Sequence, residues 1–287
     1  MRVNFYFTVK EQCEYMQREN KDIITVEGIY KNLRGNAKSL KIEVLDCVNS
    51  TNDYLKEVAK SNGGAPHGTV IISRKQTGGK GRLGREFFSP DSTGIYMSIL
   101  LKEFPSGDCI FNLTTFSAVC VANAIEKVSS QKMGIKWVND IYSNGRKVCG
   151  ILAEAGTSAN SEKPDYIVLG IGINVYEPKG GFPDYIKSKA GAVYPAGKEK
   201  KGQFDMITAE VLNVLFERFD EINTGVYMDE YADMSIMVGK NIKIRYLHEE
   251  TEFSGLVMGI EKNGALNVKL TNGEIREFTA GEISTVL

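Results

Sequence analysis

Residues 74–85 combine backbone flexibility with a high density of positive charge. The segment reads Arg-Lys-Gln-Thr-Gly-Gly-Lys-Gly-Arg-Leu-Gly-Arg, so four glycines and five Lys or Arg side chains fall within twelve positions, directly after the apolar run 69–72. Glycine lets a backbone turn sharply and approach a ligand closely, and Lys and Arg supply charge-assisted hydrogen bonds to phosphate oxygens. The segment therefore predicts a loop that binds an anionic ligand, most simply a nucleotide.

Further motifs with chemically useful side chains lie on both sides of this loop. They are Ser50-Thr51-Asn52, Lys136-Trp137-Val138-Asn139-Asp140, Lys147-Val148-Cys149-Gly150-Ile151-Leu152 and Gly170-Ile171-Gly172-Ile173-Asn174. Only two histidines occur, far apart, and the five cysteines include no Cys-x-x-Cys pair. A histidine-based triad and a His- or Cys-rich metal site are therefore disfavoured. Any catalysis here should depend on cations, backbone donors and the positioning of substrates.

The composition excludes several classes of protein. The chain of 287 residues has 35 basic and 36 acidic side chains and a net charge of −1, whereas a nucleic-acid-binding module needs a basic excess or stripe. No apolar stretch of about 18 residues is present, and the N-terminal residues lack a secretory signal, so we expect no membrane association. Cysteines in odd number without regular spacing indicate reduced thiols, and we expect a cytoplasmic location.

Regular hydrophobic patterns predict the elements that must position these motifs. Apolar runs or alternation predict strands over 41–47, 70–73, 96–102, 134–138, 147–155 and 166–172. Apolar stripes predict helices over 26–33, 112–128 and 207–222, and Ser50 with Asp53 is the start signal of another helix. The turn 143–145 contains Asn-Gly and predicts a hairpin, while 176–202, rich in Lys, Gly and Pro, predict a long mobile loop.

The C-terminal region differs in composition from the rest. Short strand patterns over 240–247, 253–260, 265–270 and 275–279 alternate with turn signals. About 50 residues of such a meander are typical of a small SH3-like β-barrel. We therefore divide the chain into an N-terminal extension (1–24), a catalytic domain (25–236) and a C-terminal SH3-like domain (237–287).

Taken in order, the motifs resemble those of the biotin protein ligases, the biotin–[biotin carboxyl carrier] or biotin–[acetyl-CoA-carboxylase] synthetases. Ser50-Thr51-Asn52 matches the Ser-Thr-Asn of that family, residues 76–85 match its adenylate loop, and 136–140 match Lys-Trp-Pro-Asn-Asp. The motifs 147–152 and 170–174 and the C-terminal Gly281-Glu282-Ile283-Ser284 complete the series. The resemblance covers about residues 40 to 287.

The resemblance implies a fold and a reaction. The fold is α+β, with a mixed, mostly antiparallel sheet backed by helices and a small SH3-like β-barrel after it. The enzyme would activate biotin with Mg-ATP as biotinyl-5′-AMP, release pyrophosphate, and transfer biotin to a lysine of a biotin carboxyl carrier domain. Biotin and Mg-ATP are then substrates, Mg²⁺ is the required ion, and no prosthetic group is bound.

The resemblance also assigns residues to the site. The catalytic residues are Lys147, Arg82 and Asp140. The biotin-binding residues are Ser50, Thr51, Asn52, Gln76, Gly79, Lys147 and Gly150. The residues for ATP and the adenylate are Lys80, Gly81, Arg82, Arg85, Trp137, Asn139, Lys147 and Asn174. Asn139 is in addition a candidate Mg²⁺ ligand. Trp137 is a wall of the ligand site in this assignment, although a tryptophan taken on its own is more often a core residue.

Three positions depart from the family pattern. Val138 stands in place of a proline, so the turn loses a fixed φ, and Lys80 stands in place of a frequent arginine and loses its bidentate fork. Phe87 occupies the place of an aromatic residue that is often tryptophan. None of the three removes a group that the chemistry requires.

Alternatives and partners follow from the same comparison. A lipoate–protein ligase shares the fold, but its usual Arg-Arg-x-Ser-Gly-Gly-Gly-x-Val run is absent. The short segment before residue 40 predicts a monofunctional ligase that does not bind DNA rather than a bifunctional repressor. The expected partner is a biotin carboxyl carrier domain, and formation of a homodimer stays open. We also expect residues 176–200 and 74–85 to become ordered when the adenylate forms.

Overall fold

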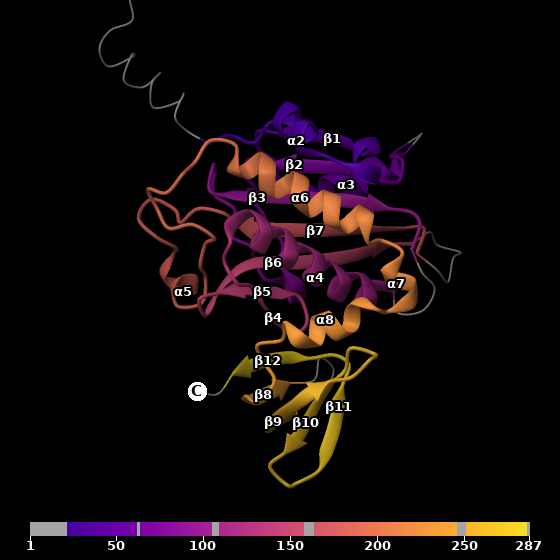
Figure 1. Ribbon diagram of the computed structural model, residues 1–287, viewed down its shortest axis with the longest axis vertical. Coiled ribbons are helices and arrows are strands. Elements are labelled where there is room, and N and C mark those ends of the chain that lie inside the picture. Colours follow the sequence, from indigo (N-terminus) through magenta and orange to yellow (C-terminus); the bar gives the residue numbers. More distant parts are fainter. Residues whose placement is uncertain (1–21, 62–63, 105–108, 158–163, 246–250, 286–287) are drawn as a thin grey trace, which may run out of the picture.

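A computed structural model describes residues 22–61, 64–104, 109–157, 164–245 and 251–285. It contains a seven-stranded sheet covered by helices and, after it in the chain, a five-stranded sheet. In Figure 1 the smaller sheet lies beyond β4 and α8, at the end of the molecule opposite β1. This agrees with the predicted fold class. The boundaries of the predicted domains stay predictions, and most of the N-terminal extension lies outside the described residues.

The large sheet is mixed and mostly antiparallel, as predicted. Its strand order is β1-β2-β3-β7-β6-β5-β4, and β1 and β2 form its one parallel pair among the described strands. The strands are β1 (Lys41–Leu45), β2 (Thr69–Ser73), β3 (Gly94–Leu101), β4 (Gly134–Lys136), β5 (Asp140–Ser143), β6 (Arg146–Gly156) and β7 (Tyr166–Asn174).

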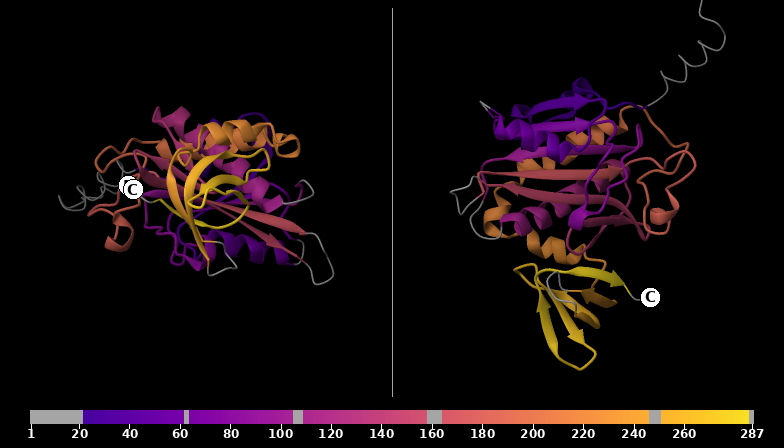
Figure 2. Two further views of the ribbon diagram at one scale, coloured as in Figure 1. Left: turned by 90° about the horizontal axis from the view of Figure 1, so that it is seen from below. Right: turned by 180° about the vertical axis from the view of Figure 1, so that it is seen from behind.

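Helices cover both faces of this sheet. The helices α4 (Cys109–Ser129) and α6 (Gln203–Glu217) pack on one face, and α3 (Thr51–Lys60) packs on the other (Figures 1 and 2). Because side chains alternate along a strand, Val70 and Ile72 join the core beneath α4 and α6, while Ile71 joins Leu55 of α3 in a second cluster. The remaining helices are α2 (Val26–Asn32), the 3₁₀ turns Gly35–Ser39 and Arg82–Gly84, α5 (Asp184–Lys187), α7 (Glu221–Thr224) and α8 (Tyr227–Asp233).

Helix α4 is the most apolar of the described helices. It is the one helix in the described ranges that is long and apolar enough to cross a membrane, but 72% of its most apolar window is buried inside the protein. Ala118, Val119, Ala122 and Ile125 are fully buried. An all-round apolar helix of this kind is the central helix of a packed core.

The smaller sheet is a five-stranded antiparallel sheet with the order β11-β10-β9-β8-β12, in which β8 to β11 form a meander and β12 pairs with β8. Its strands are β8 (Asn241–Arg245), β9 (Glu252–Ile260), β10 (Leu266–Leu270), β11 (Ile275–Phe278) and β12 (Glu282–Thr285). Alternate residues of β8, Ile242 and Ile244, are buried, and Asn241, Lys243 and Arg245 are exposed, so one face carries the core of this sheet.

Several boundaries differ from the sequence prediction. The Asn144-Gly145 turn, with φ of 49° and 74°, joins β6 to β5, a strand that the prediction lacked. The apolar stripe of the predicted helix 207–222 covers two helices, α6 and α7, since α6 ends at Glu217. Helix α8 and strand β12 were also missed, because short amphipathic segments carry too little periodicity.

The segment 176–202 is largely irregular, as predicted, but it is tied to the sheet. The amide of Val193 donates to the carbonyl of Asn174, and that of Tyr194 donates to the carbonyl of Val175. Phe182, Ala190 and Val193 are buried. The predicted mobility of this segment and its ordering by ligand stay predictions.

Candidate functional site

Most of the predicted site residues lie on the face of the large sheet opposite α4 and α6, and Trp137 is an exception. Glycine and isoleucine alternate along β7 from Gly170 to Ile173, and the isoleucines belong to the core. A Cβ atom added at Gly170 would lie 2.3 Å from Asn52 Oδ1, and one at Gly172 would lie 2.6 Å from the Phe87 ring. The bare backbone at these glycines therefore lets polar and aromatic side chains from other segments lie directly on the sheet.

The amide of Gln76 is held at both ends beneath the start of α3. Its Oε1 accepts hydrogen bonds from the amide and the hydroxyl of Thr51, at 2.8 and 3.1 Å, and its Nε2 donates to Ser89 Oγ at 2.9 Å. The hydroxyl of Ser98, which is fully buried, lies 2.7 Å from Thr51 Oγ1 and 2.6 Å from Asn52 Oδ1. Hydroxyl and amide groups from three segments thus meet in one buried cluster.

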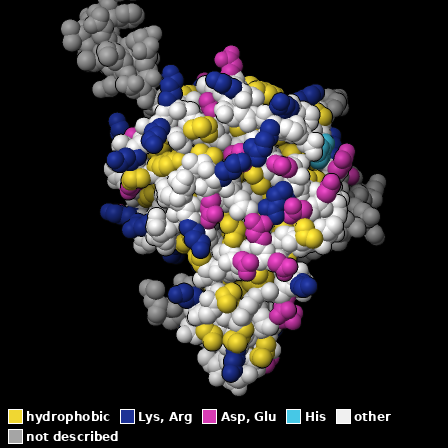
Figure 3. All heavy atoms as spheres, in the orientation of Figure 1, with side chains coloured by type: hydrophobic (Ala, Val, Ile, Leu, Met, Phe, Trp, Pro, Cys, Tyr) yellow, Lys and Arg dark blue, Asp and Glu magenta, His cyan; other side chains and the backbone are white. Residues whose placement is uncertain are grey.

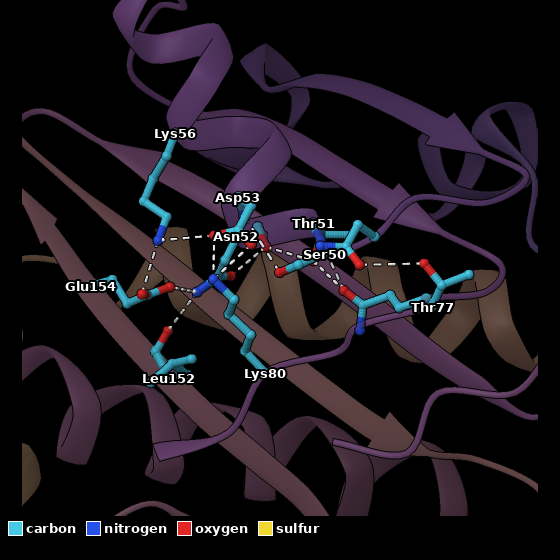
Figure 4. A network of polar contacts seen from close by, with 12 residues as sticks. Ser50, Thr51, Asn52, Asp53, Lys56, Thr77, Lys80, Leu152 and Glu154 are labelled. Carbon is cyan, nitrogen blue, oxygen red and sulfur yellow. Dashed lines mark hydrogen bonds and ion pairs between the residues drawn. The ribbon is translucent and has the colours of Figure 1, made fainter. Parts of the chain in front are cut away.

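Asn52 extends this cluster toward β6, as Figure 4 shows. Its Nδ2 donates to Glu154 Oε2 at 2.7 Å, and Glu154 Oε1 accepts from Lys56 at 2.9 Å. Ser50 begins α3 as its N-cap, and its hydroxyl accepts from the amide of Asp53 at 3.4 Å. The capping signal read from the sequence is confirmed, and the cap places Thr51 and Asn52 in the first turn, over the sheet.

The ammonium of Lys80 is held by Asp53 at 2.7 Å, and Lys56 lies 3.2 Å from the same carboxylate (Figure 4). Burial opposes ionisation of Asp53, but the hydrogen bonds from Lys80 and Lys56 outweigh it and lower the pKa of Asp53. The ion pair ties the glycine-rich loop to the first turn of α3. Phosphate binding, the role predicted for Lys80, requires its ammonium to exchange Asp53 for the phosphate.

The loop itself folds back as a short hairpin. The amide of Phe87 donates to the carbonyl of Gly79 at 2.8 Å, and the amide of Gly81 donates to the carbonyl of Arg85 at 2.7 Å. At the tip, Leu83 has a φ of 58° and Gly84 a φ of 72°. Gly79 is required for a different reason, because a Cβ there would lie 2.4 Å from the Phe87 carbonyl oxygen. The hairpin holds the cations of the loop at its tip and sides.

The ring of Phe87 lies between the polar cluster at the start of α3 and the side chain of Lys147. It contacts the backbone of Gly172, and a Cβ at Gly150 would lie 3.4 Å from the ring and 3.2 Å from Lys147 Nζ. Phe87 also makes an edge contact with Tyr96, at 6.4 Å between ring centroids. The ring therefore packs on the glycines of β6 and β7, next to the side chain of Lys147.

Lys147, the predicted catalytic lysine, forms an ion pair with Asp140. The distance from Lys147 Nζ to Asp140 Oδ1 is 2.5 Å, and both side chains are partly exposed. The backbone of Lys147 is bonded on both sides by the 176–202 segment, to the carbonyl of Lys189 and the amide of Gly191, each at 2.8 Å. Two of the predicted catalytic residues are thus adjacent, on neighbouring strands.

Arg82, the third predicted catalytic residue, reaches the same region from the loop. Its Nη1 donates to Asn139 Oδ1 at 3.1 Å, while Asn139 Nδ2 donates to the carbonyl of Ile151 at 2.7 Å. Burial lowers the pKa of Arg82, and the charge of Asp140 acts against this shift. The guanidinium is therefore already partly desolvated, which strengthens its interaction with any anion that enters.

Further cations surround Asp140. Lys136 faces Asp140 in the register of β4 and β5, and burial lowers the pKa of Lys136. The charge of Asp140 opposes this shift, and nearby Lys189 adds to it. Arg85 lies at the exposed side of the loop and pairs with Glu282 of β12. The carboxylate of Asp140 thus lies among several ammonium and guanidinium groups. Positive charge exceeds negative charge around it, and a polyanionic ligand would balance that excess.

Trp137 lies in the core. Its side chain is 5% exposed, and its indole nitrogen donates to the carbonyl of Gly264, at 3.0 Å, in the turn between β9 and β10. This agrees with the interpretation of Trp137 as a core residue. A contact of Trp137 with the adenylate stays a prediction.

Asn174 lies at the end of β7, and its Nδ2 donates to the carbonyl of Gly191 at 2.9 Å. It therefore supports the 176–202 segment beside Lys147, and its predicted role in ATP binding remains untested.

Metal ions in proteins are held by sets of donor side chains such as His, Cys, Asp and Glu. No group of three or more His, Cys, Asp or Glu side chains with metal-binding geometry occurs among the described residues. Asn139 Oδ1 already accepts from Arg82, and Asp140 is paired with Lys147, so the donors nearest to the cations are engaged. The role of Asn139 as a Mg²⁺ ligand stays a prediction.

The cations of the loop do not form an external basic stripe. Lys80, Arg82 and Arg85 each point to an acidic or amide group of the protein. Figure 3 shows the opposite face, over α4 and α6, where side chains of both signs are interspersed.

Sequence reasoning left several members of the site unassigned. Ser98 and Ser89 complete the cluster around Gln76, Glu154 orients Asn52, and Phe87 lies at the centre. Ser98 had a signal, since it is the one serine or threonine in the apolar strand 95–101. The others had none, because their partners are distant in sequence.

Comparison with known proteins places these observations in a family. The profile of the "Biotin/lipoate A/B protein ligase family" matches residues 44–174, and that of the "Biotin protein ligase C terminal domain" matches residues 238–286. The first match spans the described site from the β1–α3 turn to Asn174, and the second spans the five-stranded sheet.

Individual relatives agree with the profiles. The chain is 31% identical over 254 residues to the "Bifunctional ligase/repressor BirA" of Bacillus subtilis, covering 85% of this chain and 76% of the relative. It is 27% identical over 207 residues to the "Biotin--[acetyl-CoA-carboxylase] ligase" of Paracoccus denitrificans, covering 68% and 82%. Among solved structures, the biotin protein ligase of Aquifex aeolicus in complex with biotin and ATP matches with a TM-score of 0.70 and 26% identity, over 86% of this chain and 98% of that one.

Proposed function

This chain belongs to the biotin protein ligase family, and from that membership and its site we propose that it activates biotin with ATP and transfers it to a carrier protein. In the first step the biotin carboxylate attacks the α-phosphorus of ATP. A mixed anhydride between the carboxylate and the α-phosphate forms, the bond between the α-phosphorus and the α,β-bridging oxygen breaks, and pyrophosphate leaves with that oxygen. In the second step a lysine amine of a biotin carboxyl carrier domain forms an amide with the biotinyl carbonyl, and AMP leaves.

The observation that carries the proposal is the position of Lys147. Its ammonium lies over the backbone of Gly150, beside the Phe87 ring, and its partner is a single carboxylate at 2.5 Å. The first step brings two anions together, so the site must neutralise both. An ammonium that can exchange Asp140 for the biotin carboxylate and the α-phosphate is suited to that task.

Arg82 supports the same step from the opposite side. The guanidinium of Arg82 is partly desolvated, and the hydrogen bond that it donates goes to the neutral amide of Asn139. A phosphate group would give it a stronger partner than an amide does. We propose that Arg82 retains the adenylate until the acceptor lysine arrives, and that Mg²⁺ enters as part of the Mg-ATP substrate.

The buried polar cluster suits the ureido ring of biotin. That ring offers two N–H donors and one carbonyl acceptor, and Ser50, Thr51 and Gln76 carry complementary hydroxyl and amide groups. Because the two ends of the Gln76 amide are held by Thr51 and Ser89, the orientation of the amide is set before a ligand arrives. A preset arrangement of buried polar groups discriminates strongly against ligands that cannot pair with it.

Asp140 is the candidate base for the transfer step. Once Lys147 engages the adenylate, the carboxylate of Asp140 is released from its ion pair and faces the position where an amine would attack. A neutral amine is required at that point, and a carboxylate within hydrogen-bonding reach is one route to it.

The test is ATP–pyrophosphate exchange by the purified protein with biotin, lipoate or octanoate. Exchange that depends on biotin alone supports adenylation of biotin, and a subsequent gain of one biotinyl group by an added carrier domain supports the transfer. Exchange with lipoate or octanoate instead would assign the chain to the lipoate branch that the first family profile also includes. Exchange with none of the three would contradict the proposal.

A further inference from the structure

The C-terminal sheet meets the catalytic domain through the turn between β9 and β10. The carbonyl of Gly264 in this turn accepts the indole hydrogen of Trp137 at 3.0 Å, and the bond is buried on both sides. Ala265, the next residue, is fully buried. The turn is therefore inserted into the catalytic domain rather than resting on its surface.

The seat of this turn admits only glycine. Gly264 has a φ of +80°, and a Cβ atom there would lie 2.4 Å from the Phe111 ring of α4 and 3.3 Å from Met228 of α8. Gly273, in the turn between β10 and β11, has a similar φ of +88° but no atom within 4 Å of the Cβ position. The same strained backbone conformation thus occurs twice in the C-terminal sheet, once in a tight seat and once in the open.

Trp137 opens the short turn that carries the cation partners of the site. The next residue, Val138, accepts a hydrogen bond from the buried hydroxyl of Tyr231 at 3.0 Å. Asn139 follows, with its amide between Ile151 and Arg82. Consecutive residues of this turn are therefore held by the C-terminal sheet, by α8 and by β6 together with the loop.

From this arrangement we infer that Trp137 is a positioning residue, and that Gly264 holds it so that Asn139 and Asp140 face Arg82 and Lys147. The inference rests on the proposed function and extends it. The C-terminal sheet then acts on adenylation by placing the 137–140 turn, without touching the nucleotide through Trp137. The cluster of Thr51, Gln76 and Ser98 lies away from this turn and does not depend on it.

The test compares Gly264→Ala with Gly273→Ala, which adds the same methyl group at nearly the same φ without the clash. Trp137 is the only tryptophan of the chain, so intrinsic fluorescence reports on it directly. We expect Gly264→Ala to shift the emission to the red and to raise acrylamide quenching severalfold, and Gly273→Ala to do neither. Hydrogen exchange without ligand should rise in residues 80–87 and 136–141 in Gly264→Ala only.

The enzymatic readout separates positioning from stability. We expect Gly264→Ala to raise the KM for ATP in biotin-dependent exchange roughly tenfold relative to Gly273→Ala, since small misplacements of catalytic groups have effects of this size or larger. The dissociation constant of biotin should stay within about twofold, because the ureido cluster is untouched. A merely structural role would lower the melting temperature and the amount of active protein without this split between ATP and biotin.

The outcomes distinguish the two proposals. If the wild-type protein shows no exchange with biotin, the proposed function fails, and hydrogen exchange in residues 136–141 still decides the positioning role. If the wild-type protein is active and Gly264→Ala equals Gly273→Ala in KM and in hydrogen exchange, the inference is overturned. Equal fluorescence of the two variants would also overturn it, since the indole would then not depend on the seat.

Discussion

Two sets of ion pairs in this protein use the same side-chain types in different ways. Between α6 and the start of the catalytic domain, Arg34 binds both carboxylate oxygens of Glu210, at 2.6 and 2.9 Å, and Lys127 of α4 adds a third contact at 2.9 Å. In the site, Lys147 contacts one carboxylate oxygen of Asp140, at 2.5 Å. The first set is bidentate and shared among elements, and the second is simple.

The difference lies in what each pair can exchange. Glu210 is 10% exposed, and the hydrogen bonds from Arg34 lower its pKa from 4.5 to about 2. A carboxylate bound in this way is a structural tie. Lys147 lies at the surface of the site with one short ion pair, in which a phosphate or carboxylate of a ligand can replace Asp140. Geometry, rather than residue type, separates the ion pairs that stabilise from those that are available for binding.

The strongest test of this comparison removes Lys147. We expect Lys147→Ala to reduce biotin-dependent ATP–pyrophosphate exchange about a thousandfold or more, equivalent to about 4 kcal/mol, because the ammonium that lies over Gly150 is removed. The melting temperature should change little. The matched control is Lys127→Ala, which removes one contact to Glu210 and should keep its exchange activity. Equal activity of the two variants would remove Lys147 from the chemistry.

Removal of Arg82 should have the next largest effect. We expect Arg82→Gly to weaken retention of the adenylate about a hundredfold, since a desolvated guanidinium is lost and Asn139 is left without its donor. The measurement is the release of free biotinyl-AMP, with labelling of unrelated proteins as a second readout. A variant that makes the adenylate and releases none would contradict the role assigned to Arg82.

The ion pair of Arg34 with Glu210 should show the opposite result, a loss of stability without a loss of activity. We expect Glu210→Gln to lower the free energy of unfolding by about 2 kcal/mol at neutral pH while leaving exchange activity unchanged. The folded-state pKa is depressed, so this stability is present above the ordinary pKa and is lost as pH falls toward the folded value. Urea denaturation between pH 7 and pH 3 should show the difference between wild type and variant shrinking below about pH 4.5. A constant difference across this range would refute the assignment.

The smallest effect is expected at Asp53. Asp53→Asn weakens the hold on Lys80, and because the pair is partly exposed, the free energy of unfolding should change by less than about 1 kcal/mol. Release of Lys80 should lower the KM for ATP about twofold. Titration of exchange rate against ATP decides this, and a raised KM would mean that Asp53 places Lys80 for binding rather than withholding it.

Much of the architecture was accessible from local patterns. The apolar run in 69–72, the Ser50 cap and the Asn144-Gly145 turn depend on residues close in sequence, and each corresponds to an element of the structure. The missed elements, β5, α8 and β12, are short and derive their stability from packing rather than from their own periodicity. Gly170 and Gly172 permit close packing on the sheet, and only the structure identifies Asn52 and Phe87 as the groups that pack there.

The sequence by itself determined the family, the order of the motifs and the types of group that the site could use, because these are properties of residues and short spacings. The tertiary structure decided which of these groups are engaged and by what. It joined Lys80 to Asp53, Lys147 to Asp140, and Trp137 to Gly264, 127 positions away in the chain. Such pairings depend on strand register, on the position of α3 over β7 and on the seat of one turn of the C-terminal sheet. No local pattern records them, since each is set by the packing of distant segments.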